Sequence, residues 1–174
     1  GDPIWWPSPT NSWDAAFQLT TRRAEEQDFG DAPTNYPTLL ANFGARHFIW
    51  PGFCLGTNID AELDGQPQPQ ALGDDIGLPL DDEDGVVFTP PLRIGTTNCP
   101  SVWLTSPTGK GQLDAWVDFN RNGIWEAGEQ VFNNLTLLSG PNTPGFTIPT
   151  NSGLGPTAAR FRLITTGGLL PTGA

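Results

Sequence analysis

Residues 113–129 read LDAWVDFNRNGIWEAGE, a stretch that predicts a β-strand running into a calcium-binding loop. Residues 113–117 have the alternation of side chains that is typical of a strand with one buried face. Residues 118–129 have the spacing of a twelve-residue calcium loop, with a glycine where the chain must turn sharply. The predicted ligands are Asp118, Asn120, Asn122, Ile124 through its backbone carbonyl, Glu126 and Glu129.

Because the preceding residues have the periodicity of a strand, we expect a strand-borne loop with one structural Ca²⁺ ion, not a helix-loop-helix motif. The alternative is an Asn-Gly hairpin turn that carries surface carboxylates.

The composition favours an all-β chain with one core. The 21 Gly and 18 Pro residues indicate short strands joined by turns. The formal net charge of −11 argues against nucleic acid as a partner and favours cations. No apolar run approaches membrane-spanning length. The first residues lack a signal-peptide pattern, as expected of a processed or partial chain.

Short strands separated by turn residues predict an antiparallel β-sandwich in the second half of the chain. Within the last strand, Phe161 and Leu163 are expected to face the core, and Arg160 and Arg162 to lie on the opposite, surface side. The expected strands are residues 85–89, 101–104, 113–119, 130–137, 145–148 and 158–164.

A long acidic, turn-rich region covers residues 28–86, and it predicts a second ion. Asp60, Glu62 and Asp64 repeat the first positions of a calcium loop, and Gly65 follows them. The closing carboxylate would have to come from Asp74 or Asp75. Asp82 and Asp84 are further candidate ligands. The alternative is a solvated acidic loop.

Cys54 and Cys99 are the only cysteines, and a disulfide is the simplest interpretation. It would close a loop of 45 residues and stabilise the fold by roughly 4 kcal/mol. A disulfide and millimolar calcium both fit an extracellular location. Two buried free thiols in a cytosolic protein are the alternative.

Residues 1–27 predict a separate N-terminal arm, followed by a single domain over residues 28–174. Residues 13–20 alternate like a strand, and three prolines forbid a continuous helix before them. Exposed tryptophans favour aggregation, so the arm must pack on its own domain or on another subunit. Its apolar residues are Ile4, Trp5, Trp6, Trp13, Phe17 and Leu19.

Seven motifs in order resemble those of bacterial GEVED-domain proteins, over residues 28–174. They are residues 28–33 (DFGDAP), 44–47 (GARH), 60–67 (DAELDGQP), 73–75 (GDD), 81–86 (DDEDGV), 115–123 (AWVDFNRNG) and 159–163 (ARFRL). The resemblance implies secreted or surface-anchored bacterial proteins with an Ig-like β-sandwich and calcium loops. It implies location and architecture more firmly than activity.

In that family, the stretch similar to residues 169–174 continues into an acidic segment and a final strand, whereas this chain ends at Ala174. A sandwich without that strand would have an open edge. We therefore expect that residues 4–20 of one subunit could complete the sheet of the next, as in donor-strand assembly into a head-to-tail filament. The alternative is that the chain is a fragment of a longer protein.

Three classes of function follow, and a calcium-stabilised extracellular structural subunit is the first. The second is an adhesin or carbohydrate-binding module that uses Trp50, Trp103 or Trp125 as a stacking platform, with glycans as partners. We expect Trp103 and Trp116 to be buried. A glycan array would separate these two classes.

The third class, an enzyme, is disfavoured. Paired carboxylates with His47 could support acid-base chemistry on glycans. However, His47 lacks a nucleophile or metal triad in recognisable spacing, and no cofactor fingerprint is present. We expect no enzymatic activity.

Overall fold

The computed structural model describes residues 26–73, 84–88 and 91–174, and this part of the chain is all-β, as predicted. Its only helices are two 3₁₀ turns, η1 (Leu40–Asn42) and η2 (Ala127–Glu129). The predicted arm residues from Ile4 to Leu19 lie outside the described residues, as do Asp74, Asp75 and Asp82. The strands are β1 (Gln27–Phe29), β2 (Arg46–Phe48), β3 (Cys54–Leu55), β4 (Val86–Val87), β5 (Thr97–Asn98), β6 (Ser101–Thr105), β7 (Lys110–Val117), β8 (Gln130–Leu138), β9 (Gly140–Asn142), β10 (Phe146–Thr147) and β11 (Ala159–Ile164).

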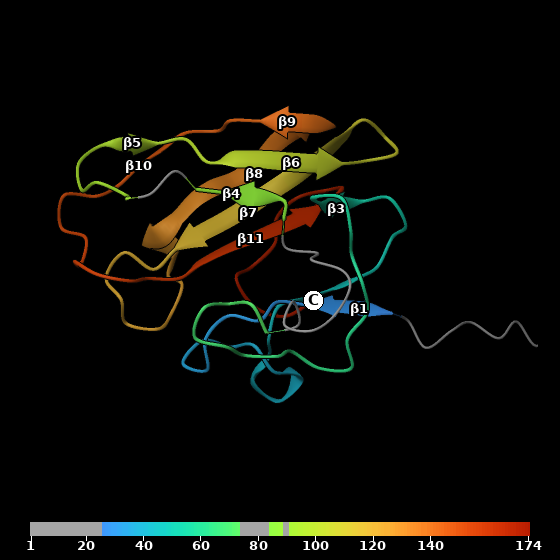
Figure 1. Ribbon diagram of the computed structural model, residues 1–174, viewed down its shortest axis with the longest axis horizontal. Coiled ribbons are helices and arrows are strands. Elements are labelled where there is room, and N and C mark those ends of the chain that lie inside the picture. Colours follow the sequence, from blue (N-terminus) through green and yellow to red (C-terminus); the bar gives the residue numbers. More distant parts are fainter. Residues whose placement is uncertain (1–25, 74–83, 89–90) are drawn as a thin grey trace, which may run out of the picture.

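All strand pairs are antiparallel, and two sheets form the body of the domain (Figure 1). One has the order β11-β7-β8. In the other, β6 lies at the centre and pairs with β3, β4 and β9. The pairs β1-β2 and β5-β10 form two smaller sheets. The six strands expected from the sequence are therefore present, whereas β1, β2, β3, β5 and β9 were not foreseen.

Side chains from both main sheets share one hydrophobic core. Val102 and Leu104 of β6 are fully buried against the inner face of β7 and β8. Phe161 and Leu163 pack against this core, as the alternation in the last strand predicted. The other main contributors are Leu113, Ala115, Val117, Phe132, Leu137, Phe146 and Ile148.

Strand β7 is buried on both faces, which corrects the expectation of a half-buried strand. Its outer face packs in a second cluster, formed by Ala32, Tyr36, Trp116 and Trp125. Asp114 on this face is fully buried, and its carboxylate accepts hydrogen bonds from the side chain of Gln130 and the amides of Asn134 and Leu169. Strand β7 is therefore a central strand, and its buried polar side chain forms hydrogen bonds within the protein instead of with water.

Arg160 and Arg162 on β11 are buried, which corrects their assignment to the surface. Arg160 donates hydrogen bonds to the carbonyls of Pro37 and Pro171. The two arginines form hydrogen bonds that hold segments distant in sequence against the outer side of β11.

The predicted disulfide is wrong, because Cys54 and Cys99 are not bonded to each other. Cys54 pairs with Thr105 at one end of β6, whereas Cys99 precedes the other end. Six residues of extended chain span roughly 20 Å, and bridged Cα atoms must lie within about 7 Å of each other. The strand register therefore separates the two thiols.

Candidate functional site

The predicted calcium loop connects β7 to β8 directly after the buried end of β7. Gly123 has a φ of 82°, so glycine stands at a left-handed turn that most side chains would strain. Asn120 Oδ1 accepts the amide of Asn122 at 2.9 Å, and Asn122 Oδ1 accepts the amide of Ile124 at the same distance. These successive side-chain turns coil the loop around its own oxygens.

Asp118 is the buried anchor of the loop, with a side chain that is fully shielded from solvent. Its Oδ1 accepts the amides of Arg121 at 2.6 Å and Asn122 at 3.1 Å. Its Oδ2 accepts the amide of Gly123 at 2.9 Å and the hydroxyl of Tyr36 at 2.6 Å. Four donors therefore fill the roughly four lone-pair positions of this carboxylate.

Glu129 closes the loop from the other side. Its Oε1 accepts the amide of Asn120, and its Oε2 accepts the amide of Glu126, both at 3.1 Å. The side-chain amide of Asn120 donates to Glu126 Oε2 at 2.9 Å. The six predicted ligands thus belong to one compact loop.

The donor set suits Ca²⁺ in kind, but not every ligand is ready to bind it. Asn120, Asn122, Glu126 and Glu129 each keep acceptor capacity beyond these hydrogen bonds. Asp118 does not, so direct coordination would require it to release a donor such as Tyr36. Among the described residues, no group of three or more His, Cys, Asp or Glu side chains forms a metal-binding arrangement.

Aromatic stacking connects the loop to β11. Trp125 stacks on Tyr36, with ring centroids 4.3 Å apart, and the guanidinium of Arg160 lies 4.2 Å from the Trp125 ring. Burial, followed by the hydrogen bond to Asp118, raises the pKa of Tyr36 to about 12. Tyr36 therefore stays protonated and donates to Asp118 at physiological pH.

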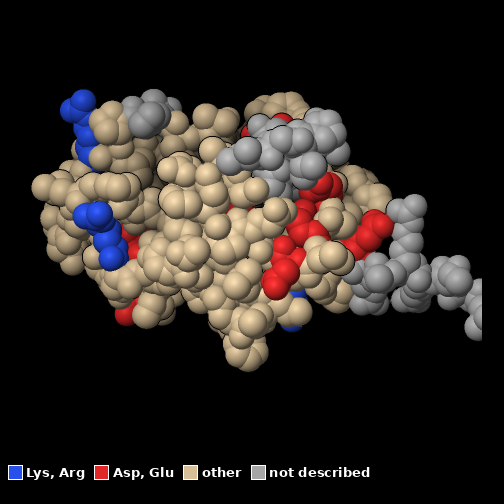
Figure 2. Space-filling view, turned by 60° about the horizontal axis from the view of Figure 1, so that its bottom comes forward, with Lys and Arg blue, Asp and Glu red and all other residues tan. Residues whose placement is uncertain are grey.

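The described carboxylates of the predicted second calcium loop serve different partners. Glu62 accepts the amide of Phe29 at 2.8 Å, Asp64 that of Leu40 at 2.6 Å, and Asp84 that of Thr57 at 3.1 Å. Burial raises the pKa of Glu62, and the neighbouring Asp60 raises it further. Acidic side chains gather towards one end of the face shown in Figure 2. The second ion stays a prediction, because its closing carboxylates lie outside the described residues.

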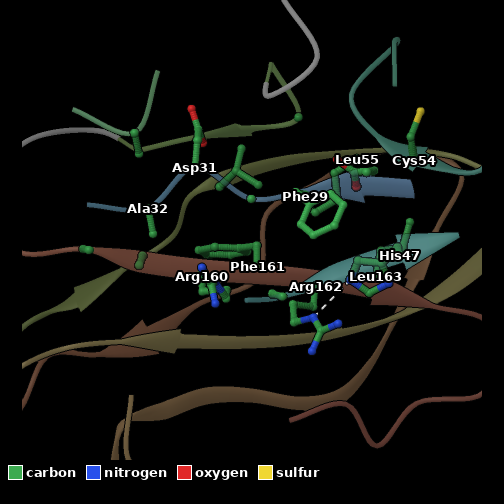
Figure 3. A pocket seen from close by; sticks show the side chains of 18 of the residues that line it. Phe29, Asp31, Ala32, His47, Cys54, Leu55, Arg160, Phe161, Arg162 and Leu163 are labelled. Atoms are coloured by element: carbon green, nitrogen blue, oxygen red, sulfur yellow. Dashed lines mark hydrogen bonds between the residues drawn. The ribbon is translucent and has the colours of Figure 1, made fainter. Parts of the chain in front are cut away.

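A cavity of about 710 Å³ lies between β11 and residues of β1 to β4. Figure 3 shows Phe161 and Leu163 on β11, with Phe29 across the cavity and Leu55 on a neighbouring segment. Sequence reasoning missed this cavity, because it forms between β11 and segments far away in the sequence, of which β1 is more than 100 residues distant.

A smaller cavity of about 290 Å³ brings Trp103 together with Thr57, Asp84 and Ser101. Trp103 is 45% exposed, which contradicts its expected burial. Trp116 is buried, as predicted, and Trp125 is buried too, so it offers no stacking platform.

Buried Arg162 and half-buried His47 contact each other in the lining of the larger cavity and form an Arg162–His47 hub. Arg162 Nε donates to His47 Nε2 at 3.0 Å, so the imidazole must be neutral at this nitrogen. Burial, followed by repulsion from Arg162 and Arg160, lowers the pKa of His47 to about 3. Burial also lowers the pKa of Arg162 to about 10, against the opposing effect of Asp114. His47 therefore acts as a structural acceptor.

Acid should destabilise the fold through His47. The unfolded chain binds this proton near pH 6.5 and the folded chain only near pH 3, so stability is complete above pH 6.5 and is lost as the pH falls between these values. At pH 4.5 the loss relative to pH 7 should be about 2.5 kcal/mol. His47→Gln keeps a hydrogen-bond acceptor but does not titrate, so its stability should not show this loss. The difference in unfolding free energy between His47→Gln and wild type, measured with urea, should therefore shift in favour of the variant by this amount from pH 7 to pH 4.5. A constant difference would contradict the role of His47.

The fold and the loop define the class of protein. It is an all-β domain with an acidic loop between two strands. Comparison with protein families matches residues 112–173 to the GEVED domain. The matched part extends from β7 to the C-terminal segment. Neither the curated proteins nor the solved structures contain a significant match. Among the described residues, no helix has the length and apolar character of a membrane span.

Proposed function

We propose that the chain is a non-enzymatic, calcium-stabilised structural subunit of a bacterial extracellular assembly, joined head to tail by strands donated from the N-terminal arm. The observation that supports the calcium role is the 118–129 loop, in which the predicted ligands lie close together and buried Asp118 anchors the loop in the domain. Ca²⁺ takes six to eight such oxygens. Asn120, Asn122, Glu126, Glu129 and the Ile124 carbonyl would hold it, together with Asp118 after release of a donor.

Thermal unfolding of the full chain tests the calcium role. A site with a Kd of about 10⁻⁴ to 10⁻³ M stabilises the folded state by about 0.6–2 kcal/mol in ~2 mM Ca²⁺, or roughly 2–7 °C. The melting temperature should rise by this amount relative to excess chelator. The same concentration of Mg²⁺ should give a smaller rise, because Mg²⁺ demands a stricter geometry. Identical melting in Ca²⁺ and chelator would contradict the proposal.

The smaller cavity favours one second candidate, a carbohydrate-binding module. Half-exposed Trp103 lies beside the carboxylate of Asp84 and the hydroxyls of Thr57 and Ser101, an arrangement that can stack on a sugar ring and bind its hydroxyls. Selective binding on a glycan array that disappears in Trp103→Ala would favour this candidate over a purely structural subunit.

A further inference from the structure

We infer that the cavity of about 710 Å³ beside β11 is the acceptor site of the assembly, and that residues 13–20 of a second copy enter it as an added strand. This inference rests on the proposed strand-donation assembly and identifies its contact surface.

The cavity combines the two features that a donated strand requires. Within the described residues, β11 is an edge strand that pairs only with β7, and an edge strand is a template for an added strand. The cavity also presents apolar side chains that could receive alternate residues of that strand. They include Phe29, Phe53, Leu55, Val86, Phe161 and Leu163.

Residues 13–20 match this surface in pattern and length. Their sequence, WDAAFQLT, puts Trp13, Ala15, Phe17 and Leu19 on one face of an extended strand. Eight residues span roughly 26 Å as a strand, which is enough to cover the six residues of β11.

A buried acceptor in the cavity also favours a strand as its occupant. Asp31 is 3% exposed, and its Oδ2 accepts the amide of Gly73. Its Oδ1 has no hydrogen-bond partner within the described part of the chain. Buried acceptors rarely lack a donor, and a strand supplies backbone N–H groups. The arm also carries Arg22 and Arg23 directly after its strand, opposite in charge to Asp31 and its cavity neighbour Asp28.

The linker between the arm and β1 favours insertion of the arm into the cavity of a second copy over insertion into the cavity of its own chain. Residues 21–26 read TRRAEE and connect the arm to β1. They contain none of the Gly, Pro, Asn or Asp residues that mark a tight reversal. Four of the six are charged, as expected of a solvated connection between subunits.

Two complementary variants of the full chain test the pairing by sedimentation velocity. The buffer contains about 2 mM Ca²⁺, because extracellular calcium sites bind in the millimolar range. Phe17→Asp disables the arm, and Ala159→Arg blocks the cavity from an exposed position on β11. Each variant alone should be monomeric. Their equimolar mixture should form a 1:1 dimer, because it contains one intact arm and one intact cavity.

Matched controls keep the test specific. Gln18→Asp changes the opposite face of the arm, and Ala41→Arg adds the same side chain at an exposed position outside the cavity. Both should assemble like wild type. If Ala159→Arg fails to fold, Phe48→Arg replaces it, because Phe48 lines the cavity and is 57% exposed.

A mixture that stays monomeric, or a Phe17→Asp variant that still assembles, would overturn the inference. If wild type nevertheless forms calcium-dependent assemblies, the proposed function survives and only the acceptor site is wrong. If wild type is monomeric and Phe17→Asp lowers its melting temperature, the arm occupies its own cavity, and both the inference and the proposed assembly fail.

Discussion

Arg162→Ala is expected to destabilise the domain by about 4 kcal/mol. Arg162 is 2% exposed and donates to His47 and to the carbonyls of Leu170, Thr172, Arg46 and Gly173 at 2.5 to 3.2 Å. Removal of the guanidinium takes a donor from each of these acceptors, although the Gly173 carbonyl still accepts the amide of Arg46, and it weakens the attachment of the C-terminal segment to β11. Urea unfolding measures the loss.

Two variants separate the hydrogen-bonding role of Arg162 from its charge. Arg162→Lys keeps the charge but has three donors instead of five, so we expect it to lose about half as much stability as Arg162→Ala. Arg93→Ala removes an exposed arginine and should change stability by less than about 0.5 kcal/mol. If Arg162→Ala changed stability as little as Arg93→Ala does, the hub would not stabilise the fold.

Asp118→Ala is expected to lose about 3 kcal/mol in chelator, and also to lose the additional stabilisation by calcium. Without this carboxylate, the amides of Arg121 and Gly123 and the hydroxyl of Tyr36 lose this acceptor, and the amide of Asn122 keeps only its bond to Asn120 Oδ1. Thermal unfolding in chelator and in 2 mM Ca²⁺, a concentration suited to extracellular calcium sites, separates the two effects.

Tyr36→Phe is the informative companion of this variant. It removes the hydroxyl that competes with a cation for Asp118 Oδ2, so the chain should be less stable in chelator but gain more from calcium than wild type does. Glu26→Ala, which removes an exposed carboxylate outside both predicted calcium loops, should keep the wild-type calcium effect. If Asp118→Ala kept that effect too, the loop would not be the calcium site.

Local patterns predicted the local structure well. The alternation in residues 113–117 corresponds to β7, and the ligand spacing in residues 118–129 corresponds to a coiled loop between two strands. Both depend on interactions between residues close in sequence, such as the amide of Ile124 with the side chain of Asn122. Such interactions leave a signature in the spacing of residue types.

Contacts between distant segments could not be predicted in the same way. Arg160 and Arg162 alternate with apolar residues like a surface face, yet segments near residues 37, 46 and 170 cover them. The expected disulfide failed for a related reason, since the pairing of Cys54 with Thr105 separates the thiols. Trp103 and the cavity beside β11 likewise depend on strand pairing that no local pattern specifies.

Electron microscopy of the purified full chain, in millimolar Ca²⁺ and after chelation, tests the central claim most directly. A calcium-stabilised structural subunit should form ordered filaments in calcium that dissociate when the ion is removed. Single particles of monomer size in both buffers would contradict it.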